Sequence, residues 1–331
     1  MWLPRILDDY IFNELHAVYK IDPGAVKRGQ LGIENYLGTY FPRSFVESYL
    51  IFKDLFMLPE VQQNYQDIDE ISILDIGTGT GGQILGLLWL LDDIGILAGK
   101  TVNIVCIDAD GTALERFRDI IGWRGWAFKI RYITHNFSDT DDIWNTIMRE
   151  TNNESFDFLL SSKFCCELYF NRPEDFYGLY NKMFEIFNDK IRTSGFAIVL
   201  DTTDKNRDED SSSFIPMIMT KCYRKFLREN SSSARIKCIL PLSCAYWGIH
   251  CTERACFRQK VFDISHTHRE NDISRVVYYV FTSNENASNI LNYNNIGQTY
   301  ITGGVKDCSC GSLTNIQRGI GIDAFSFHEV E

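Results

Sequence analysis

Short apolar runs recur along the chain, and each ends on a polar or glycine-rich turn. Unbroken runs of this length indicate parallel strands that are covered on both faces, and helical spacing between them indicates covering helices. The runs lie at 71–76, 102–107, 128–133, 156–160 and 196–200, and a later one, RVVYYVFT, lies at 275–282. Strands that alternate with helices predict an α/β fold with a Rossmann-like sheet.

The pattern changes on both sides of this region. Residues 1–70 show helical apolar spacing and predict an amino-terminal helical cap. We expect the α/β domain at 71–230, a cysteine-rich insertion at 231–268, and the final strands with a carboxyl-terminal tail at 269–331. Within that last part, the polar segment 284–298 is predicted to be a loop and 299–305 a strand.

The segment ISILDIGTGTGGQ, residues 71–83, turns the first strand into a helix through a glycine loop. Gly77, Gly79 and Gly81 allow a sharp turn and a close approach of a ligand to the backbone. The following helix offers N–H groups that have no partner inside the helix. The loop therefore predicts a nucleotide-type cofactor site, and the alternative is a tight turn without a ligand.

Asp75 narrows the choice of cofactor, because it ends the strand two residues before the first glycine. A carboxylate there would repel the pyrophosphate of a dinucleotide but attract a cation. S-adenosylmethionine carries both an ammonium and a sulfonium group. The sequence therefore predicts S-adenosylmethionine as the cofactor, with Asp75 and the glycines at its methionine end.

The next strands supply polar residues at the same edge of the predicted sheet, where open α/β sheets bind ligands. Asp108 ends the second strand and is predicted to accept the ribose hydroxyls, with Asp110 as the alternative. Asn136 follows the third strand and is predicted to bind the adenine, near Phe137. Ser161 directly follows the fourth strand and is predicted to border the transfer site.

Charge and hydropathy limit the partners. The net charge of −11 argues against a uniformly basic, nucleic-acid-coating surface. One local basic patch is the exception, and it could be either an RNA contact or a solvated helix face. It consists of Lys221, Arg224, Lys225, Arg228, Arg235 and Lys237. No apolar run reaches the roughly 18 residues of a membrane span, so we expect a soluble protein without a membrane partner. We expect a cytoplasmic protein, with the mitochondrial matrix as the alternative.

Cysteines gather late in the chain. Cys238, Cys244, Cys251 and Cys256 fall within nineteen residues, and Cys308 and Cys310 follow. Irregular segments of this kind are typical of metal sites, although reduced thiols without a metal are the alternative. A histidine could replace one thiol, and the candidates are His250, His266 and His268. Three scattered cysteines are instead predicted to be buried and structural: Cys106, Cys165 and Cys222.

Five motifs together resemble a known family. They are YLGTYFPRSFVESYLIFKDL, ILDIGTGTGG, FDFLLSSKFCCEL with its Glu167-Leu168 pair, SCAYWGIHCTERACFRQKV and VKDCSCGSL. The chain is similar over most of its length to the methyltransferase-like proteins of the mitochondrial small ribosomal subunit. These ribosome assembly factors also have bacterial members and belong to the class I S-adenosylmethionine-dependent methyltransferases.

The resemblance implies a metal cofactor. In that family four thiolates hold an iron–sulfur cluster, so Cys244, Cys251, Cys256 and Cys308 would hold one here. Cys238 or Cys310 could replace one of these ligands. Four thiolates also suit zinc, which is the alternative metal.

Three functions fit these features. The first is an S-adenosylmethionine-dependent methyltransferase that acts on RNA or on the small ribosomal subunit. The second is a noncatalytic ribosome assembly factor that keeps the cofactor fold, and the third is a small-molecule methyltransferase. Methyl transfer depends chiefly on positioning the nucleophile in line, so no catalytic residue is predicted.

Overall fold

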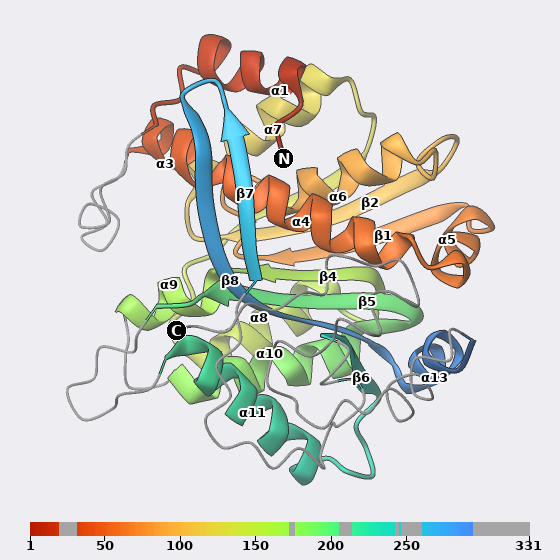
Figure 1. Cartoon of the computed structure of the whole chain (residues 1–331). Coiled ribbons are helices and arrows are strands. Elements are labelled where there is room, and N and C mark those ends of the chain that lie inside the picture. Colours follow the sequence, from red (N-terminus) through yellow and green to blue (C-terminus); the bar gives the residue numbers. More distant parts are fainter. Residues whose placement is uncertain (20–31, 172–175, 205–213, 242–244, 246–259, 294–331) are drawn as a thin grey trace.

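The computed structural model describes residues 1–19, 32–171, 176–204, 214–241, 245 and 260–293. These residues form an α/β fold in which helices cover both faces of one sheet (Figure 1). The predicted fold class is therefore confirmed.

The sheet has eight strands within the described residues, in the order β3-β2-β1-β4-β5-β8-β6, with β7 paired to β8. The first five strands pair in parallel, and β8 runs antiparallel between β5 and β6. The strands are β1 (Glu70–Ile76), β2 (Thr101–Asp108), β3 (Lys129–Thr134), β4 (Phe156–Ser162), β5 (Ile191–Thr202), β6 (Ile236–Leu240), β7 (Lys260–His266) and β8 (Arg269–Ser283).

The strand order reverses at β1, which lies between β2 and β4. Chain segments that leave the ends of β1 and β4 therefore diverge to opposite faces of the sheet. This divergence opens a crevice at the carboxyl edge, the usual ligand position in such sheets. The glycine loop follows β1 directly, so it lies at this switch point.

Two apolar cores lie on the two faces of the sheet. The cap helices, α6 and α7 pack on one face, and α8, α10 and α11 pack on the other (Figure 1). None of the helices in the described ranges has the length and apolarity of a membrane span. The helices are α1 (Arg5–Asp9), the π-helical turn η1 (Tyr10–Glu14), α3 (Ile33–Thr39), α4 (Phe41–Phe56), α5 (Pro59–Gln66), α6 (Gly82–Asp93), α7 (Gly111–Arg124), α8 (Thr140–Thr151), α9 (Phe164–Asn171), α10 (Phe176–Lys190), α11 (Ile215–Glu229) and α13 (Asn284–Tyr293).

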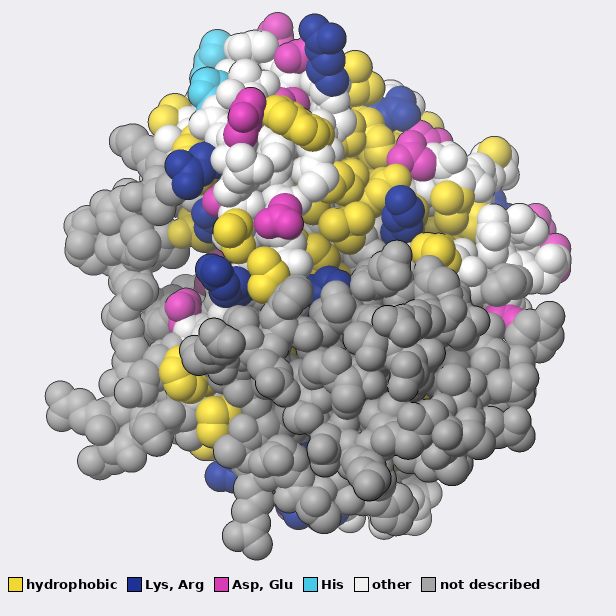
Figure 2. Space-filling model, in the orientation of Figure 1, with side chains coloured by type: hydrophobic (Ala, Val, Ile, Leu, Met, Phe, Trp, Pro, Cys, Tyr) yellow, Lys and Arg dark blue, Asp and Glu magenta, His cyan; other side chains and the backbone are white. Residues whose placement is uncertain are grey.

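The cap is joined to the sheet by close packing and by hydrogen bonds. A Cβ atom on Gly86 of α6 would lie 2.3 Å from the carbonyl oxygen of Phe45 in α4, so only glycine permits this helix contact. The β7–β8 hairpin reaches the first residues of the chain, where the Thr267 hydroxyl donates to Asp8 at 2.6 Å. Figure 2 shows acidic, basic and apolar side chains interspersed over this upper face.

Two segments differ from the sequence-based predictions. The predicted cysteine-rich insertion begins and ends with strands of the sheet, because β6 and β7 both pair with β8. The predicted loop at 284–298 is wrong for its first part, where α13 forms. Ala287 and Ile290 of this helix are buried, so tertiary packing stabilises a helix in a largely polar segment. The strand predicted at 299–305 lies outside the described residues.

Candidate cofactor site at the carboxyl edge

The glycine loop makes a sharp turn between β1 and α6. Gly77, Gly79 and Gly81 have φ angles of 77°, 53° and 79°, a region that side chains rarely tolerate. The N–H groups of Gly77 and Thr78 donate to the carbonyl oxygen of Ile107 in β2, at 2.9 and 3.2 Å. The loop is therefore anchored to the neighbouring strand at the switch point of the sheet.

Asp75 is buried beside this loop. Its side chain is 1% exposed, and neither carboxylate oxygen has a hydrogen-bond partner among the described residues. Burial raises the pKa of Asp75 well above its usual value and the nearby Asp108 raises it further, while the Thr78 side chain and the Ile76 backbone N–H oppose the rise only in part. A buried carboxylate in this condition is costly unless a cation or a donor joins it.

Asp108 holds the glycine loop from the end of β2. Its two carboxylate oxygens accept the N–H groups of Gly79 at 2.7 Å and of Asp110 at 2.8 Å. Burial raises the pKa of Asp108, and these hydrogen bonds oppose the rise. Asp110 instead caps α7, since its side chain accepts the N–H of Thr112 at 2.9 Å. The structure thus places Asp108 against the loop and gives Asp110 a role as a helix cap.

Two further residues, which the sequence did not single out as site residues, lie beside the glycine loop. Tyr36 of α3 covers Gly79, where an added Cβ would lie 3.3 Å from the phenol oxygen. The phenol donates to Glu167 of α9 at 3.3 Å. Solvent reaches Glu167, yet the surrounding protein desolvates its carboxylate and Asp108 repels it, so its pKa rises to about 7. In the sequence Glu167 stands out only as part of a family motif, and no local pattern singles out Tyr36.

Three carboxylates, those of Asp75, Asp108 and Glu167, therefore lie around the glycine loop, and Asp108 raises the pKa values of the other two. Their common effect is an electronegative site that would favour a positively charged ligand. We call these three residues the acidic cluster.

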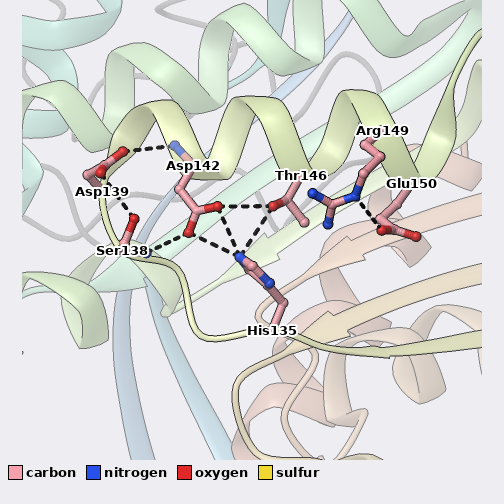
Figure 3. Close-up of polar contacts among 7 residues, drawn as sticks. All are labelled: His135, Ser138, Asp139, Asp142, Thr146, Arg149 and Glu150. Carbon is pink, nitrogen blue, oxygen red and sulfur yellow. Dashed lines mark hydrogen bonds and ion pairs between the residues drawn. The ribbon is translucent and has the colours of Figure 1, made fainter.

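The loop after β3 carries Asn136 and Phe137, and polar contacts fix its shape (Figure 3). His135 Nε2 lies 3.0 Å from Asp142 Oδ2, and the same oxygen accepts the N–H of Ser138 at 2.7 Å. The backbone hydrogen bond from Ser138 is the main cause that lowers the pKa of Asp142 to about 2. The loop is also tied to the acidic cluster, because the backbone N–H of His135 donates to the backbone carbonyl oxygen of Asp108 at 2.8 Å.

The side chains of this loop point in different directions. Asn136 is exposed, whereas Phe137 is buried and packs edge-on against Phe164, with 5.5 Å between ring centroids. Asn136 is thus available to a ligand at the carboxyl edge, and Phe137 belongs to the core.

Ser161 lies near the end of β4 but on the other face of the sheet from Asp75. Its neighbours along this face, Leu159 and Val199, belong to the core beneath α10 and α11. The side chain is 1% exposed, and its hydroxyl has no hydrogen-bond partner among the described residues. The structure therefore does not bring Ser161 into the acidic cluster.

Lys163 fixes the turn between β4 and α9. It has a φ angle of 59°, which is unfavourable for a residue with a side chain. Its ammonium forms a buried ion pair with Glu47 of α4, with 2.8 Å from Nζ to Oε2. Ser274 of β8 also donates to Glu47, so one network joins the cap, β4 and β8. This network positions the helix that carries Glu167.

Asp201, near the end of β5, also holds α9 in place. It accepts the Tyr180 hydroxyl at 2.7 Å and the backbone N–H of Cys166 at 3.1 Å. Burial is the main cause that raises the pKa of Asp201 to about 6. These hydrogen bonds satisfy the carboxylate of Asp201, so its role is to hold α9 and α10 in place beside the candidate site.

The predicted metal ligands Cys244, Cys251, Cys256 and Cys308 lie outside the described residues, as does Cys310. Three of the alternative ligands are described: His268 is exposed, whereas Cys238 and His266 pack in the protein interior. Cys238 is fully buried in β6 and donates to the carbonyl oxygen of Leu240, and His266 is fully buried against Phe12. No group of three or more potential metal ligands occurs within the described ranges. Burial of the structural cysteines Cys106, Cys165 and Cys222 is confirmed.

No family model matches the sequence, and no curated protein matches it. Several solved structures are similar in part. An S-adenosylmethionine-dependent methyltransferase from Clostridium acetobutylicum is 10% identical, with 72% of this chain and 91% of that chain covered and a TM-score of 0.36. A protein from Pyrococcus horikoshii, described as a candidate RNA methyltransferase, is 14% identical, with coverages of 85% and 98% and a TM-score of 0.37.

A third similar structure, TrmN from Thermus thermophilus, is 12% identical, with a TM-score of 0.36. The alignment covers 68% of this chain and only 48% of TrmN. At such identities and TM-scores, function has to be argued from the site itself.

Proposed function

We propose that the chain binds S-adenosylmethionine at the carboxyl edge and is an S-adenosylmethionine-dependent methyltransferase. The observation that carries this proposal is the buried carboxylate of Asp75, which has no partner among the described residues and lies beside the glycine loop. A cation would offset the cost of burying this charge, because an opposite charge nearby favours the ionised form.

The residues fit this cofactor better than a dinucleotide. The acidic cluster would attract the ammonium and sulfonium groups, whereas it would repel a pyrophosphate. We assign Asp75 and the glycine loop to the methionine end, Asp108 to the ribose and Asn136 to the adenine. Each carboxylate oxygen of Asp108 keeps acceptor capacity beyond its one backbone hydrogen bond. When bound, the cofactor supplies an electrophilic methyl group.

We propose RNA or the small ribosomal subunit as the substrate, as the motif resemblance implies. The same resemblance supports a second function, a noncatalytic assembly factor that retains the cofactor fold. Both functions include cofactor binding, so binding and transfer have to be measured separately.

Titration calorimetry with S-adenosylmethionine tests the cofactor. We expect binding by the native chain and a loss of at least tenfold in affinity for Asp75→Ala, because an interaction with a charged group contributes about 1.5–3 kcal/mol. Glu154→Ala is the matched control, since it removes a carboxylate from the opposite edge of the same sheet. Unchanged binding by Asp75→Ala would show that the cofactor assignment is wrong.

Transfer of a labelled methyl group tests the reaction. The substrates to compare are isolated ribosomal RNA, small-subunit particles and a metabolite pool. Label in RNA or in particles supports the proposed substrate, and label only in a metabolite supports a small-molecule methyltransferase. Cofactor binding without transfer to any of them would leave the noncatalytic assembly factor.

The iron–sulfur cluster stays a prediction, since its four cysteines lie outside the described residues. Metal analysis of protein purified without oxygen tests it. Iron with acid-labile sulfide supports the cluster, zinc supports the alternative, and neither metal contradicts both.

A further inference from the structure

Helix α11 presents a positively charged face to solvent. Its other face packs in the core beneath the sheet, together with α10. Lys221, Lys225 and Arg228 are exposed and recur at four- and three-residue intervals, so they lie along one side of the helix. At 1.5 Å per residue they span about 10 Å. We call these three residues the basic stripe.

Little acidic charge opposes the basic stripe. Lys225 reaches Glu229 at 3.8 Å, but both side chains are more than half exposed, so this pair contributes little. Lys221 and Arg228 form no ion pair with another described residue. On another surface Arg131, by contrast, pairs with Glu154 at 2.7 Å. The upper face in Figure 2 likewise mixes both signs of charge.

An exposed aromatic ring lies beside the basic stripe. Tyr177 of α10 is 42% exposed, and the ammonium of Lys221 lies 5.2 Å from its ring centroid. One helical turn later, the Tyr180 hydroxyl binds Asp201 at the end of β5. Tyr177 therefore lies where the basic stripe meets the carboxyl edge of the sheet.

We propose that the basic stripe and Tyr177 form a docking surface for single-stranded RNA that leads to the candidate cofactor site. This inference rests on the proposed function and names the substrate class of the same site. The cations would contact successive phosphates, and a base would stack on Tyr177, the combination by which proteins hold single strands. The net charge of −11 repels a polyanion elsewhere and so directs it to this surface.

Fluorescence anisotropy with a labelled twelve-nucleotide single-stranded RNA tests the docking surface, using the full chain without cofactor. The variant Lys221→Glu, Lys225→Glu, Arg228→Glu should bind about 100-fold more weakly, and its dependence on salt should fall by about two in slope, since three phosphate contacts are lost. Tyr177→Ala should bind about tenfold more weakly through loss of stacking.

The matched control changes the net charge equally on other surfaces. Arg5→Glu, Lys129→Glu, Arg149→Glu replaces three exposed cations and should change RNA affinity by less than about threefold. An equal loss in both triple variants, or no loss in either, would overturn the docking surface. If the glutamate variant does not fold, as judged by circular dichroism, the corresponding glutamine variant takes its place.

Failure of the docking surface is distinguishable from failure of the proposed function. Calorimetry with S-adenosylmethionine should give the same affinity for the basic-stripe variant and the native chain. A native chain that binds RNA through the stripe but does not bind the cofactor would contradict the proposed function alone.

Discussion

Two aspartates on adjacent strands of the same sheet are equally buried but differ in their partners. Asp75 is the penultimate residue of β1 and is 1% exposed, and Asp157 lies at the start of β4 and is 2% exposed. Asp157 accepts the backbone N–H of Ser72 at 2.8 Å and its hydroxyl at 3.0 Å, and it pairs with Arg192 at 2.7 Å. Asp75 has no such partner. Asp157 thus belongs to the fold, whereas the environment of Asp75 fits the cofactor-binding role that we propose for it.

The same difference separates the two edges of the sheet. A cleft of about 450 Å³ lies at the amino edge, and its carboxylates face arginines: Glu154 pairs with Arg131, and Glu70 lies 3.7 Å from Arg192. At the carboxyl edge, Asp108 instead raises the pKa values of Asp75 and Glu167, and the Lys163 ammonium only partly lowers the pKa of Glu167. Charge that is matched within the protein supports stability, and unmatched charge supports binding.

Replacement of the paired aspartate should have the largest effect on stability. Asp157→Ala leaves two Ser72 donors and the Arg192 guanidinium without their acceptor, so we expect the free energy of unfolding to fall by about 3 kcal/mol. Urea denaturation measures it. The control Glu154→Ala removes a half-exposed partner of Arg131 and should cost less than about 1 kcal/mol. A similar loss in both variants would remove the distinction between buried and exposed pairing.

Replacement of Asp75 should instead weaken cofactor binding without lowering stability. Asp75→Asn should weaken S-adenosylmethionine binding by about 2 kcal/mol, while the unfolding free energy of the cofactor-free protein should not fall, because the buried charge is removed. Calorimetry and urea denaturation of the same sample measure both quantities. A large loss of stability in the absence of cofactor would assign Asp75 to the fold.

Glu167 should make stability depend on pH in a characteristic direction. Its pKa is about 7 in the folded protein against 4.5 as its ordinary value, so the folded state binds more protons between these pH values. Its contribution to the unfolding free energy therefore falls as pH rises from about 4.5 to 7. Glu167→Gln should remove this dependence and be more stable than the native chain at pH 8, by about 1 kcal/mol after screening by solvent. Thermal melts at pH 5 and pH 8 measure the difference.

Asp142 should give the smallest effect and the opposite sign. Its pKa is lowered to about 2, so its stabilisation is present above about 3.9, the unfolded value, and is lost as pH falls toward 2. Asp142→Asn should cost about 0.5–1 kcal/mol at pH 7, because it weakens the contacts of Ser138 and His135. Unfolding curves at pH 7 and pH 3 should differ less for the variant than for the native chain.

Local patterns predicted much of this fold. The five parallel strands and β8 were found because buried strands are apolar along their whole length. The edge strands β6 and β7 were missed, since their cysteine-rich surroundings suggested an irregular insertion, and β6 is only five residues long. Helix α13 was missed because its stability comes from packing of a few apolar residues on the sheet.

The sequence by itself determined which acidic residues lie at the strand ends, because Asp75 and Asp108 directly follow apolar runs and strand order places such ends at one edge. Only the tertiary structure decided which carboxylates are paired. Tyr36 and Glu167 are 131 positions apart, and Asp157 and Arg192 are 35 positions apart. Pairing depends on how distant segments fold together, and no local periodicity records it.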